Sequence, residues 1–253
     1  MPEDRFLVLS GLDPCGGAGI SADIETLNQF GVTSLPIVTS LTVQNTESVI
    51  GVSEVDSGLI TKQFNHLLQD VNFSVVKVGL IASKGQASTI LSLLSSLTNP
   101  IIVLDPIISS GSNNELLDNE TIKAIKEKLI PVVDVLTPNL NELQILCPNK
   151  DEQQAIKSLP CEWVLVTTSD SSVDEIEHRL YHHAELVERF NYTKLPGSYH
   201  GSGCTLASAI SALLSLGVNT DIACNKALEY TYQTLLNAKS IGKMQYHPNR
   251  KKP

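Results

Sequence analysis

Residues 6–41 read FLVLSGLDPCGGAGISADIETLNQFGVTSLPIVTSL, and this stretch decides the fold class. It begins with a short apolar run, passes through a glycine-rich turn into an amphipathic segment, and ends in a second apolar run. Short apolar runs that alternate with longer amphipathic segments are typical of βα units around a mainly parallel sheet. The stretch therefore predicts an α/β protein.

The same alternation continues along the chain and predicts strands and helices in turn. The predicted strands are Phe6–Ser10, Ser34–Leu41, Ser74–Leu80, Ile101–Leu104, Val132–Leu136 and Trp163–Thr167. The predicted helices are Gly19–Phe30, Ser57–Asp70, Lys84–Leu97, Asn119–Leu129, Asn139–Leu146, Glu152–Leu159, Gly203–Leu216 and Asp221–Lys239. The charged segment Asp174–Lys194 breaks the rhythm and is assigned to an antiparallel hairpin at the sheet edge. Because no linker-like stretch interrupts the chain, we expect one domain over residues 1–253.

The composition excludes several classes of protein. The 253 residues include 18 Lys and Arg against 27 Asp and Glu, a net charge of −9. The longest basic run, Arg250-Lys251-Lys252, is interpreted as a solvated tail, so nucleic acid is excluded as a partner. The apolar runs are too short to cross a membrane, and the acidic first residues carry no export signal. The five cysteines form no C-x-x-C pair, and we expect free thiols in a cytoplasmic protein.

The glycine-rich segment Leu9–Gly19 directly follows the first strand and opens a helix. Ligands of open α/β sheets bind beyond the carboxyl ends of strands, where bare backbone allows close approach. The letters Gly17-Ala-Gly19-Ile-Ser-Ala22 also fit a dinucleotide fingerprint. That motif needs an acidic residue after the second strand, where this chain has Val43-Gln44-Asn45, which disfavours it. A tight turn without a ligand is the remaining alternative.

A second glycine-rich segment, Tyr199–Ala207, also opens a helix. The successive N–H groups of Gly201, Ser202, Gly203 and Cys204 would point at one spot, where the positive helix end favours an anion. The chain contains no G-x-x-x-x-G-K-[ST], so a P-loop is excluded. The segment therefore predicts an oxyanion or phosphate cradle.

Cys204 lies in the first turn of that predicted helix. The helix dipole is expected to lower the pKa of the thiol below its free value of about 8.5, so that a thiolate there could accept a proton. The alternative is a small residue that packs the turn.

Two acidic residues follow other strands. In Val135–Glu142, Asn139 can cap a helix while Glu142 reaches back three residues, which describes a capping box. The functional alternative makes Glu142 an outer-shell ligand of Mg²⁺. Asp105 ends another strand, so the carboxylates and both glycine-rich segments share one sheet edge.

The remaining features predict no chemistry. His178, His182 and His183 lie on the charged hairpin without an acidic partner at fixed spacing, and we interpret them as solvated. Trp163 opens an apolar strand and is assigned to the core.

In order and spacing, these motifs resemble those of the hydroxymethylpyrimidine/phosphomethylpyrimidine kinases of thiamine biosynthesis, in the ribokinase-like superfamily. The resemblance covers Leu9 to about Lys239. Cys204 points to this family, because most ribokinase-like enzymes have Asp there. Its most specific parts are Gly11–Asp23, Thr42–Thr46, Asp105-Pro106, Thr137–Glu142 and His200–Thr205.

The resemblance implies a three-layer α/β/α fold that binds ATP and Mg²⁺ at the carboxyl edge of the sheet. It implies that Cys204 is the general base and that Gly201, Ser202 and Gly203 complete the anion hole. A last set of implied roles concerns ligands: Gly11, Asp23 and Gln44 line the pyrimidine pocket, Asn139 and Thr168 contact ATP, and Asp105 and Glu142 organise Mg²⁺.

The implied activity is ATP-dependent phosphorylation of 4-amino-5-hydroxymethyl-2-methylpyrimidine and then of its monophosphate, by a homodimer. Family members usually carry a lysine and paired glycines where this chain has Thr167 and Thr168, which is a departure in the ATP site. A pyridoxal/pyridoxine kinase and a non-catalytic pyrimidine-binding protein are the two alternatives.

Overall fold

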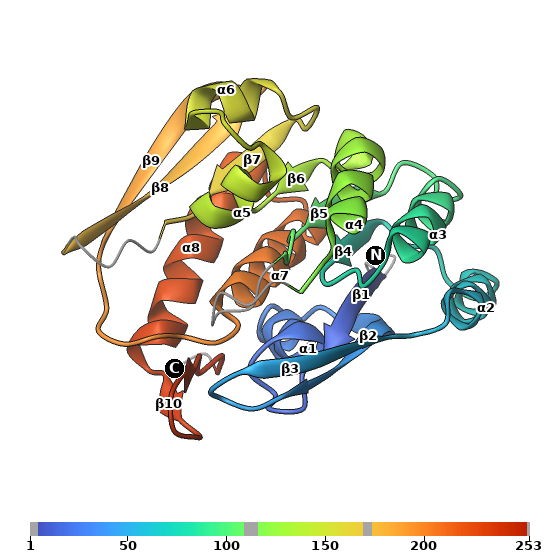
Figure 1. Ribbon diagram of the computed structural model, residues 1–253, viewed down its shortest axis with the longest axis horizontal. Coiled ribbons are helices and arrows are strands. Elements are labelled where there is room, and N and C mark those ends of the chain that lie inside the picture. The colour runs from blue at the N-terminus through green and yellow to red at the C-terminus, as the bar shows by residue number, and fades with distance from the viewer. Residues whose placement is uncertain (1–4, 109–115, 169–173, 252–253) are drawn as a thin grey trace.

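A nine-stranded mixed sheet forms the centre of the computed structural model, which describes residues 5–108, 116–168 and 174–251 (Figure 1). Its strands lie in the order β3-β2-β1-β4-β5-β6-β7-β8-β9. The parallel strands are β1 (Phe6–Leu12), β2 (Ser34–Gln44), β4 (Val75–Val78), β5 (Ile101–Leu104), β6 (Val135–Leu136) and β7 (Trp163–Val166). The antiparallel edge strands are β3 (Val49–Glu54) on one side, and β8 (Glu175–His182) and β9 (Glu185–Thr193) on the other. The predicted mainly parallel sheet with an antiparallel edge hairpin is confirmed.

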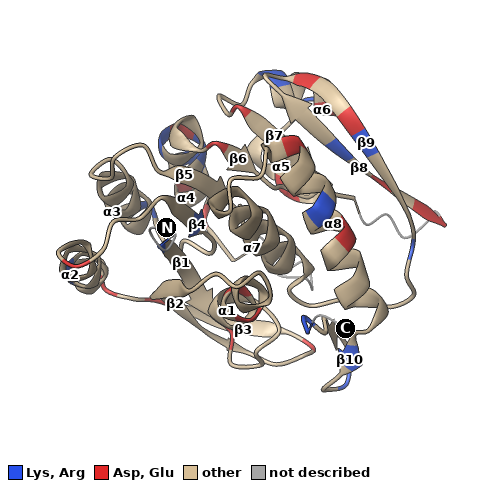
Figure 2. Ribbon diagram, turned by 180° about the vertical axis from the view of Figure 1, so that it is seen from behind, with Lys and Arg blue, Asp and Glu red and all other residues tan. Residues whose placement is uncertain are grey.

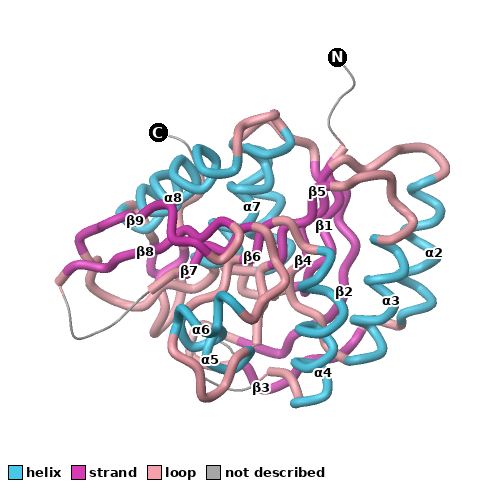
Figure 3. Tube along the Cα trace, turned by 90° about the horizontal axis from the view of Figure 1, so that it is seen from above, coloured by secondary structure: helices cyan, strands magenta, loops and turns pink. Residues whose placement is uncertain are grey.

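Helices cover both faces of the sheet, so the predicted three-layer α/β/α arrangement is also confirmed (Figure 3). One layer contains α1 (Gly19–Gln29), α7 (Ser202–Ser215) and α8 (Thr220–Leu236). The other contains α2 (Ser57–Leu68), α3 (Lys84–Leu94), α4 (Asn119–Ala124), α5 (Leu140–Leu146) and α6 (Glu152–Lys157). No helix among the described residues has both the length and the apolar character to cross a bilayer.

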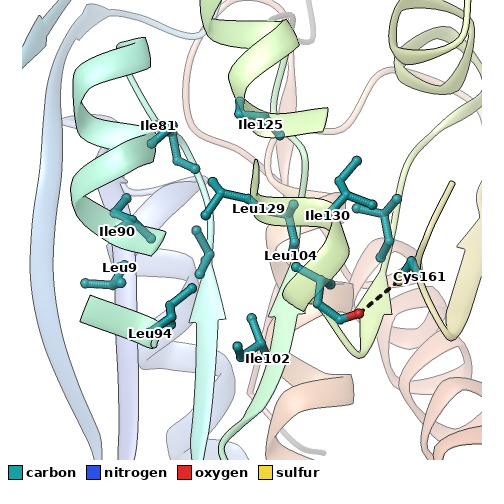
Figure 4. Close-up of a cluster of buried hydrophobic side chains, with 14 of the residues drawn as sticks. Leu9, Ile81, Ile90, Leu94, Ile102, Leu104, Ile125, Leu129, Ile130 and Cys161 are labelled. Carbon is teal, nitrogen blue, oxygen red and sulfur yellow. Dashed lines mark hydrogen bonds between the residues drawn. The ribbon is translucent and has the colours of Figure 1, made fainter. Parts of the chain in front are cut away.

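The central strands are buried on both faces, which is why they read as continuous apolar runs. In β1, Phe6 and Val8 pack with α1, whereas Leu7 and Leu9 face the layer of α2 and α3. Figure 4 shows part of this second core, where α3, the segment after α4 and the sheet meet. Each fully buried Leu or Ile side chain contributes roughly 1.5–3 kcal/mol to folding.

The charges of the predicted edge hairpin pair with one another, which explains its sequence. Arg179 of β8 lies 2.6 Å from the Glu152 carboxylate at the start of α6 and also contacts Glu177. Figure 2 shows acidic and basic residues interspersed along this hairpin. The bridges tie β8 to α6, so the charged strand is held at the edge of the sheet.

The structure departs from the predicted elements in four places. The predicted helix Asn119–Leu129 ends as an α-helix at Ala124, continues as a π-helical turn, and enters a 3₁₀ turn over Ile130–Val132. Pro131 lies at the start of that turn and lacks an N–H donor, so the following strand begins only at Val135. The edge strand β3 was not predicted. The last helix ends at Leu236, because Lys239–Ser240 (β10) pairs instead with Tyr246–His247 (β11).

Candidate active site

The carboxyl ends of the parallel strands open into a cavity of about 510 Å³. Residues at or just after the ends of β1, β2, β5, β6 and β7 line it, together with the first residues of α7. This is the edge at which open α/β sheets bind ligands. Ten of the eleven predicted site residues lie in its wall: Gly11, Gln44, Asp105, Asn139, Glu142, Thr168, Gly201, Ser202, Gly203 and Cys204.

Asp23 is the exception, because the structure does not bring it to the cavity wall. It lies in α1 with no exposed surface, and its Oδ1 is 2.9 Å from Nζ of the equally buried Lys77 in β4. Ser208 of α7 donates a second hydrogen bond to the same oxygen at 2.7 Å. A buried carboxylate needs such partners. The expectation that Asp23 lines the pyrimidine pocket is therefore corrected: this carboxylate joins α1, β4 and α7 inside the core.

Lys77 was missed by the sequence reasoning. Burial alone would lower its pKa, but the charge of Asp23, and then those of Cys204 and Asp105, outweigh burial and raise the pKa. Lys77 is therefore a permanent cation just behind the cavity wall. The available signal was a lone lysine inside the apolar strand Ser74–Leu80.

The start of α7 forms the predicted cradle, and its geometry requires glycine. Gly201 is the N-cap residue and has a φ of 83°, in the left-handed region. A Cβ on Gly201 would lie 1.8 Å from the carbonyl oxygen of Gly17, so the two glycine-rich segments touch backbone to backbone. The first N–H groups of a helix have no partner within it. Those of Ser202, Gly203 and Cys204 are therefore available at the cavity wall.

The prediction that the helix lowers the pKa of Cys204 is wrong for the unliganded protein. The thiol is 5% exposed, and burial raises its pKa. The charge of Lys77 lowers it, but Asp105 and Asp23 oppose that effect. Desolvation and two carboxylates therefore outweigh the helix end, and the free site holds a protonated thiol near Asp105.

Asp105 and Glu142 are neighbouring carboxylates in the cavity wall. Burial raises the pKa of Asp105, and burial followed by the charge of Asp105 raises the pKa of Glu142 to about 8. Oδ2 of Asp105 is buried and lacks a hydrogen-bond partner among the described residues. An oxygen-preferring divalent cation would satisfy both observations, so the residues present fit Mg²⁺.

The capping interpretation of the same motif is confirmed. Asn139 Oδ1 accepts from the Glu142 N–H, and Glu142 Oε2 accepts from the Asn139 N–H, both at 2.9 Å. The capping box holds the Glu142 carboxylate near Asp105, where both could bind Mg²⁺. This binding of Mg²⁺ stays a prediction.

Asp13 and His200 hold the first glycine-rich segment, and neither was singled out from the sequence. The Asp13 carboxylate accepts hydrogen bonds from the N–H groups of Cys15, Gly17 and Ala18, at 2.8–2.9 Å. It also lies 2.9 Å from Nε2 of His200. Burial alone would raise the pKa of Asp13, but the His200 and backbone hydrogen bonds outweigh it and lower the pKa. Both residues belong to the two glycine-rich motifs, which was the available signal.

Arg250 is buried, although the sequence suggested a solvated basic tail. Its guanidinium donates to the carbonyl of Gly17, to Thr205 Oγ1 at 2.9 Å and to the Glu25 carboxylate at 3.0 Å. Because Thr205 lies in the first turn of α7, one side chain braces both glycine-rich segments. The bidentate and forked donors of Arg suit such a position.

The far wall of the cavity is formed by the ends of β7, β8 and β9. The Thr168 N–H donates to His178 Nδ1 at 3.2 Å, and burial lowers the pKa of that histidine to about 4. The interpretation of His178 as solvated is therefore wrong. Lys194 is the one Lys or Arg side chain among the described residues that line the cavity. The sequence stretches 109–115 and 169–173 contain no Lys or Arg either.

Comparison with known proteins places this geometry in a family. The family model for phosphomethylpyrimidine kinase matches residues 13–249. A hydroxymethylpyrimidine/phosphomethylpyrimidine kinase of Aquifex aeolicus is 32% identical over 246 residues, which cover 94% of this chain and 96% of that protein. The protein of that name from Mycobacterium leprae is 30% identical and covers 94% and 91%.

Solved structures agree. A phosphomethylpyrimidine kinase from Clostridium difficile superposes with a TM-score of 0.77 at 27% identity, covering 91% of this chain and 99% of that one. A pyridoxal kinase from Staphylococcus aureus in complex with ADP gives a TM-score of 0.89 at 20% identity, over 99% and 94%. This second likeness shows the fold alone, and it confirms the ribokinase-like arrangement. Because the family model matches residues 13–249, nearly the whole of this sequence, the chain belongs to the phosphomethylpyrimidine kinase family.

Proposed function

We propose that the protein transfers the γ-phosphoryl group of ATP to the hydroxymethyl oxygen of 4-amino-5-hydroxymethyl-2-methylpyrimidine, and then phosphorylates the monophosphate, in thiamine biosynthesis. The observation that carries the proposal is one cavity whose wall contains the α7 cradle, Gln44 and the Asp105–Glu142 pair. The names of the relatives support the same activity.

Gln44 and Gly11 would hold the pyrimidine ring. The Gln44 amide nitrogen donates to Thr42 Oγ1 at 2.7 Å, which leaves its carbonyl oxygen to accept from the exocyclic amino group. A Cβ on Gly11 would lie 2.7 Å from Ser40 Oγ, so the neighbouring side chains require glycine here, and the position adds only backbone to the cavity wall. The amide therefore reads the amino group while the backbone supplies a flat surface.

The chain's contribution to the transfer is mainly positional and electrostatic. A loose phosphoryl-transfer transition state spreads charge over the equatorial oxygens, and the N–H groups of Ser202, Gly203 and Cys204 would stabilise that charge. Mg²⁺ held by Asp105 and Glu142 would neutralise phosphate charge when bound.

Cys204 would take the proton of the hydroxymethyl group in the first transfer. In the free site, Asp105 and Asp23 oppose the thiolate while Lys77 favours it. Once the charge of Asp105 is engaged by a ligand, Lys77 becomes the dominant neighbour and favours loss of the thiol proton. The second transfer starts from a phosphate oxygen, which is already anionic, and needs no base.

The nucleotide would lie against Asn139, Thr168 and Lys194. An acidic protein must bind a polyanion locally, and the cavity contains several carboxylates but a single lysine side chain among its described lining residues. Lys194 would therefore supply the side-chain cation for the ATP phosphates, and the cradle and Mg²⁺ the rest.

ADP release measures the proposed activity directly. With saturating pyrimidine and Mg²⁺-ATP we expect turnover that disappears when the pyrimidine is left out. Pyridoxal is the critical competitor, and a strong preference for it would replace the proposal by a pyridoxal kinase. Pyrimidine binding without ADP release would instead identify a non-catalytic binding protein.

We also propose a cytoplasmic homodimer. All five cysteines are free, as is usual in a reducing compartment. Leu41, Val43 and Ile50 are exposed apolar side chains on β2 and β3, and a partner subunit would cover them. Light scattering during gel filtration should give twice the chain mass, and the chain mass itself would contradict the dimer.

A further inference from the structure

A cluster of three metal-ligating side chains lies on the edge hairpin, outside the active site. Glu162 precedes β7, His182 ends β8, and His183 begins the turn into β9. One ligand atom from each lies within 4.8 Å of the others. The sequence hides this cluster, because its acidic member is twenty positions away and is brought in by the pairing of β7 with β8.

The distances suit a metal ion. Nε2 of His182 and Oε1 of Glu162 are 3.2 Å apart. Two ligands bound tetrahedrally at the Zn–N and Zn–O distances of about 2.0–2.2 Å are separated by roughly 3.3 Å. The third ligand, on the exposed His183, needs to approach by about 1.5 Å, which rotation of its side chain supplies.

Neighbouring groups hold the ligands in place. The ring of Trp163 stacks on that of His182, with centroids 3.9 Å apart and planes 16° apart. The His183 N–H donates to the Glu162 carbonyl at 2.8 Å, which joins the two ligating segments through the backbone. His183 and Ala184 both have positive φ, as a two-residue type I′ turn requires. Type I′ turns most often contain Asn-Gly, but here His183 occupies the first turn position, directly after His182.

We propose that Glu162, His182 and His183 bind a divalent transition-metal ion of the Zn²⁺ class, which fastens the β8–β9 turn to the start of β7. Imidazole ligands favour Zn²⁺, Co²⁺, Ni²⁺ or Cu²⁺ over Mg²⁺ and Ca²⁺. The three protein ligands leave one position for water. Trp163 begins β7, whereas Thr167 and Thr168 after its end line the cavity, so the metal site lies on the opposite edge of the sheet, roughly 13 Å away.

The test uses the untagged full chain and Co²⁺ or Zn²⁺ alone as the probe. Two variants remove a ligand with little change of shape: Glu162→Gln, and His183→Asn, which suits a left-handed φ. His66→Asn on the exposed face of α2 is the matched control. We expect the wild type and the control to bind one equivalent of Co²⁺ with a visible absorption band, and both ligand variants to bind at least tenfold more weakly.

Stability and activity give independent readouts. Zn²⁺ at a hundredfold excess over Kd should raise the Tm of the wild type by roughly 5–10 °C and leave that of His183→Asn unchanged. Kinase turnover should be the same in both, because the site lies away from the cavity. Equal binding by the wild type and both ligand variants, or no binding by the wild type at millimolar metal, would overturn the proposal. If the metal inhibits turnover and still binds to His183→Asn, it binds at the cavity histidines instead, and this result would also overturn the proposal.

Discussion

Cys204 shows how burial can reverse an expectation drawn from helix geometry. If the thiol removes a proton from the alcohol, Cys204→Ala should slow the first phosphoryl transfer by about 10²–10⁴-fold. The second transfer begins from an anionic phosphate oxygen and should be slowed far less. Single-turnover measurement of each step separates the two, and equal losses would assign Cys204 a purely positional role.

We expect Lys194 to affect the binding only of ligands that carry phosphate groups. We expect Lys194→Met to weaken ATP and ADP binding by roughly 10–100-fold, AMP binding less, and adenosine binding not at all, because charge-assisted hydrogen bonds contribute about 1.5–3 kcal/mol each. Calorimetric titration with the four ligands checks this, with Lys226→Met on exposed α8 as the matched control. An equal loss for all four would mean that Lys194 only supports the fold.

Glu142 predicts a pH-dependent stability of the free protein. Its pKa is raised on folding from the usual 4.5 to about 8, so the folded state binds the proton more tightly. The free energy of unfolding should therefore fall as the pH rises through this window, by up to about 1.4 kcal/mol per pH unit, and level off above it. Glu142→Gln keeps the capping box and should remove that slope.

Urea unfolding of both proteins across the same pH range isolates the Glu142 contribution as a difference. Mg²⁺ should flatten the wild-type curve, since a cation favours the carboxylate. Parallel curves for the two proteins would show that Glu142 is already ionised in the free site.

At the level of single residues, the motifs predicted which side chains reach the cavity but not their protonation. Cys204 and Glu142 were found from their neighbours in the sequence. The pKa of each depends on residues distant in the sequence, Lys77 and Asp105 among them, which come close only in the folded sheet. Asp23 illustrates the same limit, because its partner Lys77 lies on another strand.

The contact between the two glycine-rich segments makes a prediction at the level of elements. Gly201 and Gly217 flank α7 with φ values of 83° and 76°, but a Cβ on Gly217 would meet nothing within 4 Å. Gly217→Ala should therefore cost only about 1 kcal/mol, from the backbone conformation alone. Gly201→Ala adds the clash with Gly17 and should cost several kcal/mol more and abolish turnover.

Thermal unfolding of the two variants measures the difference that the clash makes. Similar Tm values would mean that the α7 start can shift away from Gly17. The glycine motif predicted a helix start from sequence, whereas the need for glycine at position 201 follows only from the second segment pressed against it.

Elements with a strong local signal were predicted well. The capping box of Asn139 and Glu142 and the apolar central strands are properties of adjacent residues. The edge strand β3 was missed because Val49–Glu54 is half exposed and gains its pairing from β2. The apolar pattern predicts a helix from Asn119 to Leu129, but the α-helix ends at Ala124. Pro131 lies beyond the predicted end, in the following 3₁₀ turn, so the pattern itself gives no sign of this change.

At the scale of the molecule, Arg250 joins parts of the chain that share no local signal. We expect Arg250→Met to lower the free energy of unfolding by about 2–3 kcal/mol, since hydrogen bonds to a charged group are lost in a buried position. Turnover should also fall, because Gly17 and Thr205 lose a common brace. Urea unfolding and ADP release test both, with Arg189→Met as an exposed arginine control.

If Arg250→Met lowers stability but not turnover at saturating substrate concentrations, Arg250 stabilises the fold without positioning the active site. The acidic composition of the chain predicts no nucleic-acid partner, and the same charge count gives no sign that Lys77 and Arg250 are buried. Both are buried cations that form hydrogen bonds inside the protein, so they add little to the charge of its surface.

The hydrogen bonds that join the two glycine-rich segments and the core behind them span long stretches of sequence: 185 positions from Asp23 to Ser208, 187 from Asp13 to His200, and 233 from Gly17 to Arg250. Most strands of the sheet, in contrast, pair with the next strand along the chain. A contact between residues far apart in sequence requires the chain to lose loop-closure entropy before the favourable energy of the contact is gained. During refolding the sheet can therefore assemble while the two glycine-rich segments are still apart, and recovery of ligand binding should lag behind recovery of secondary structure.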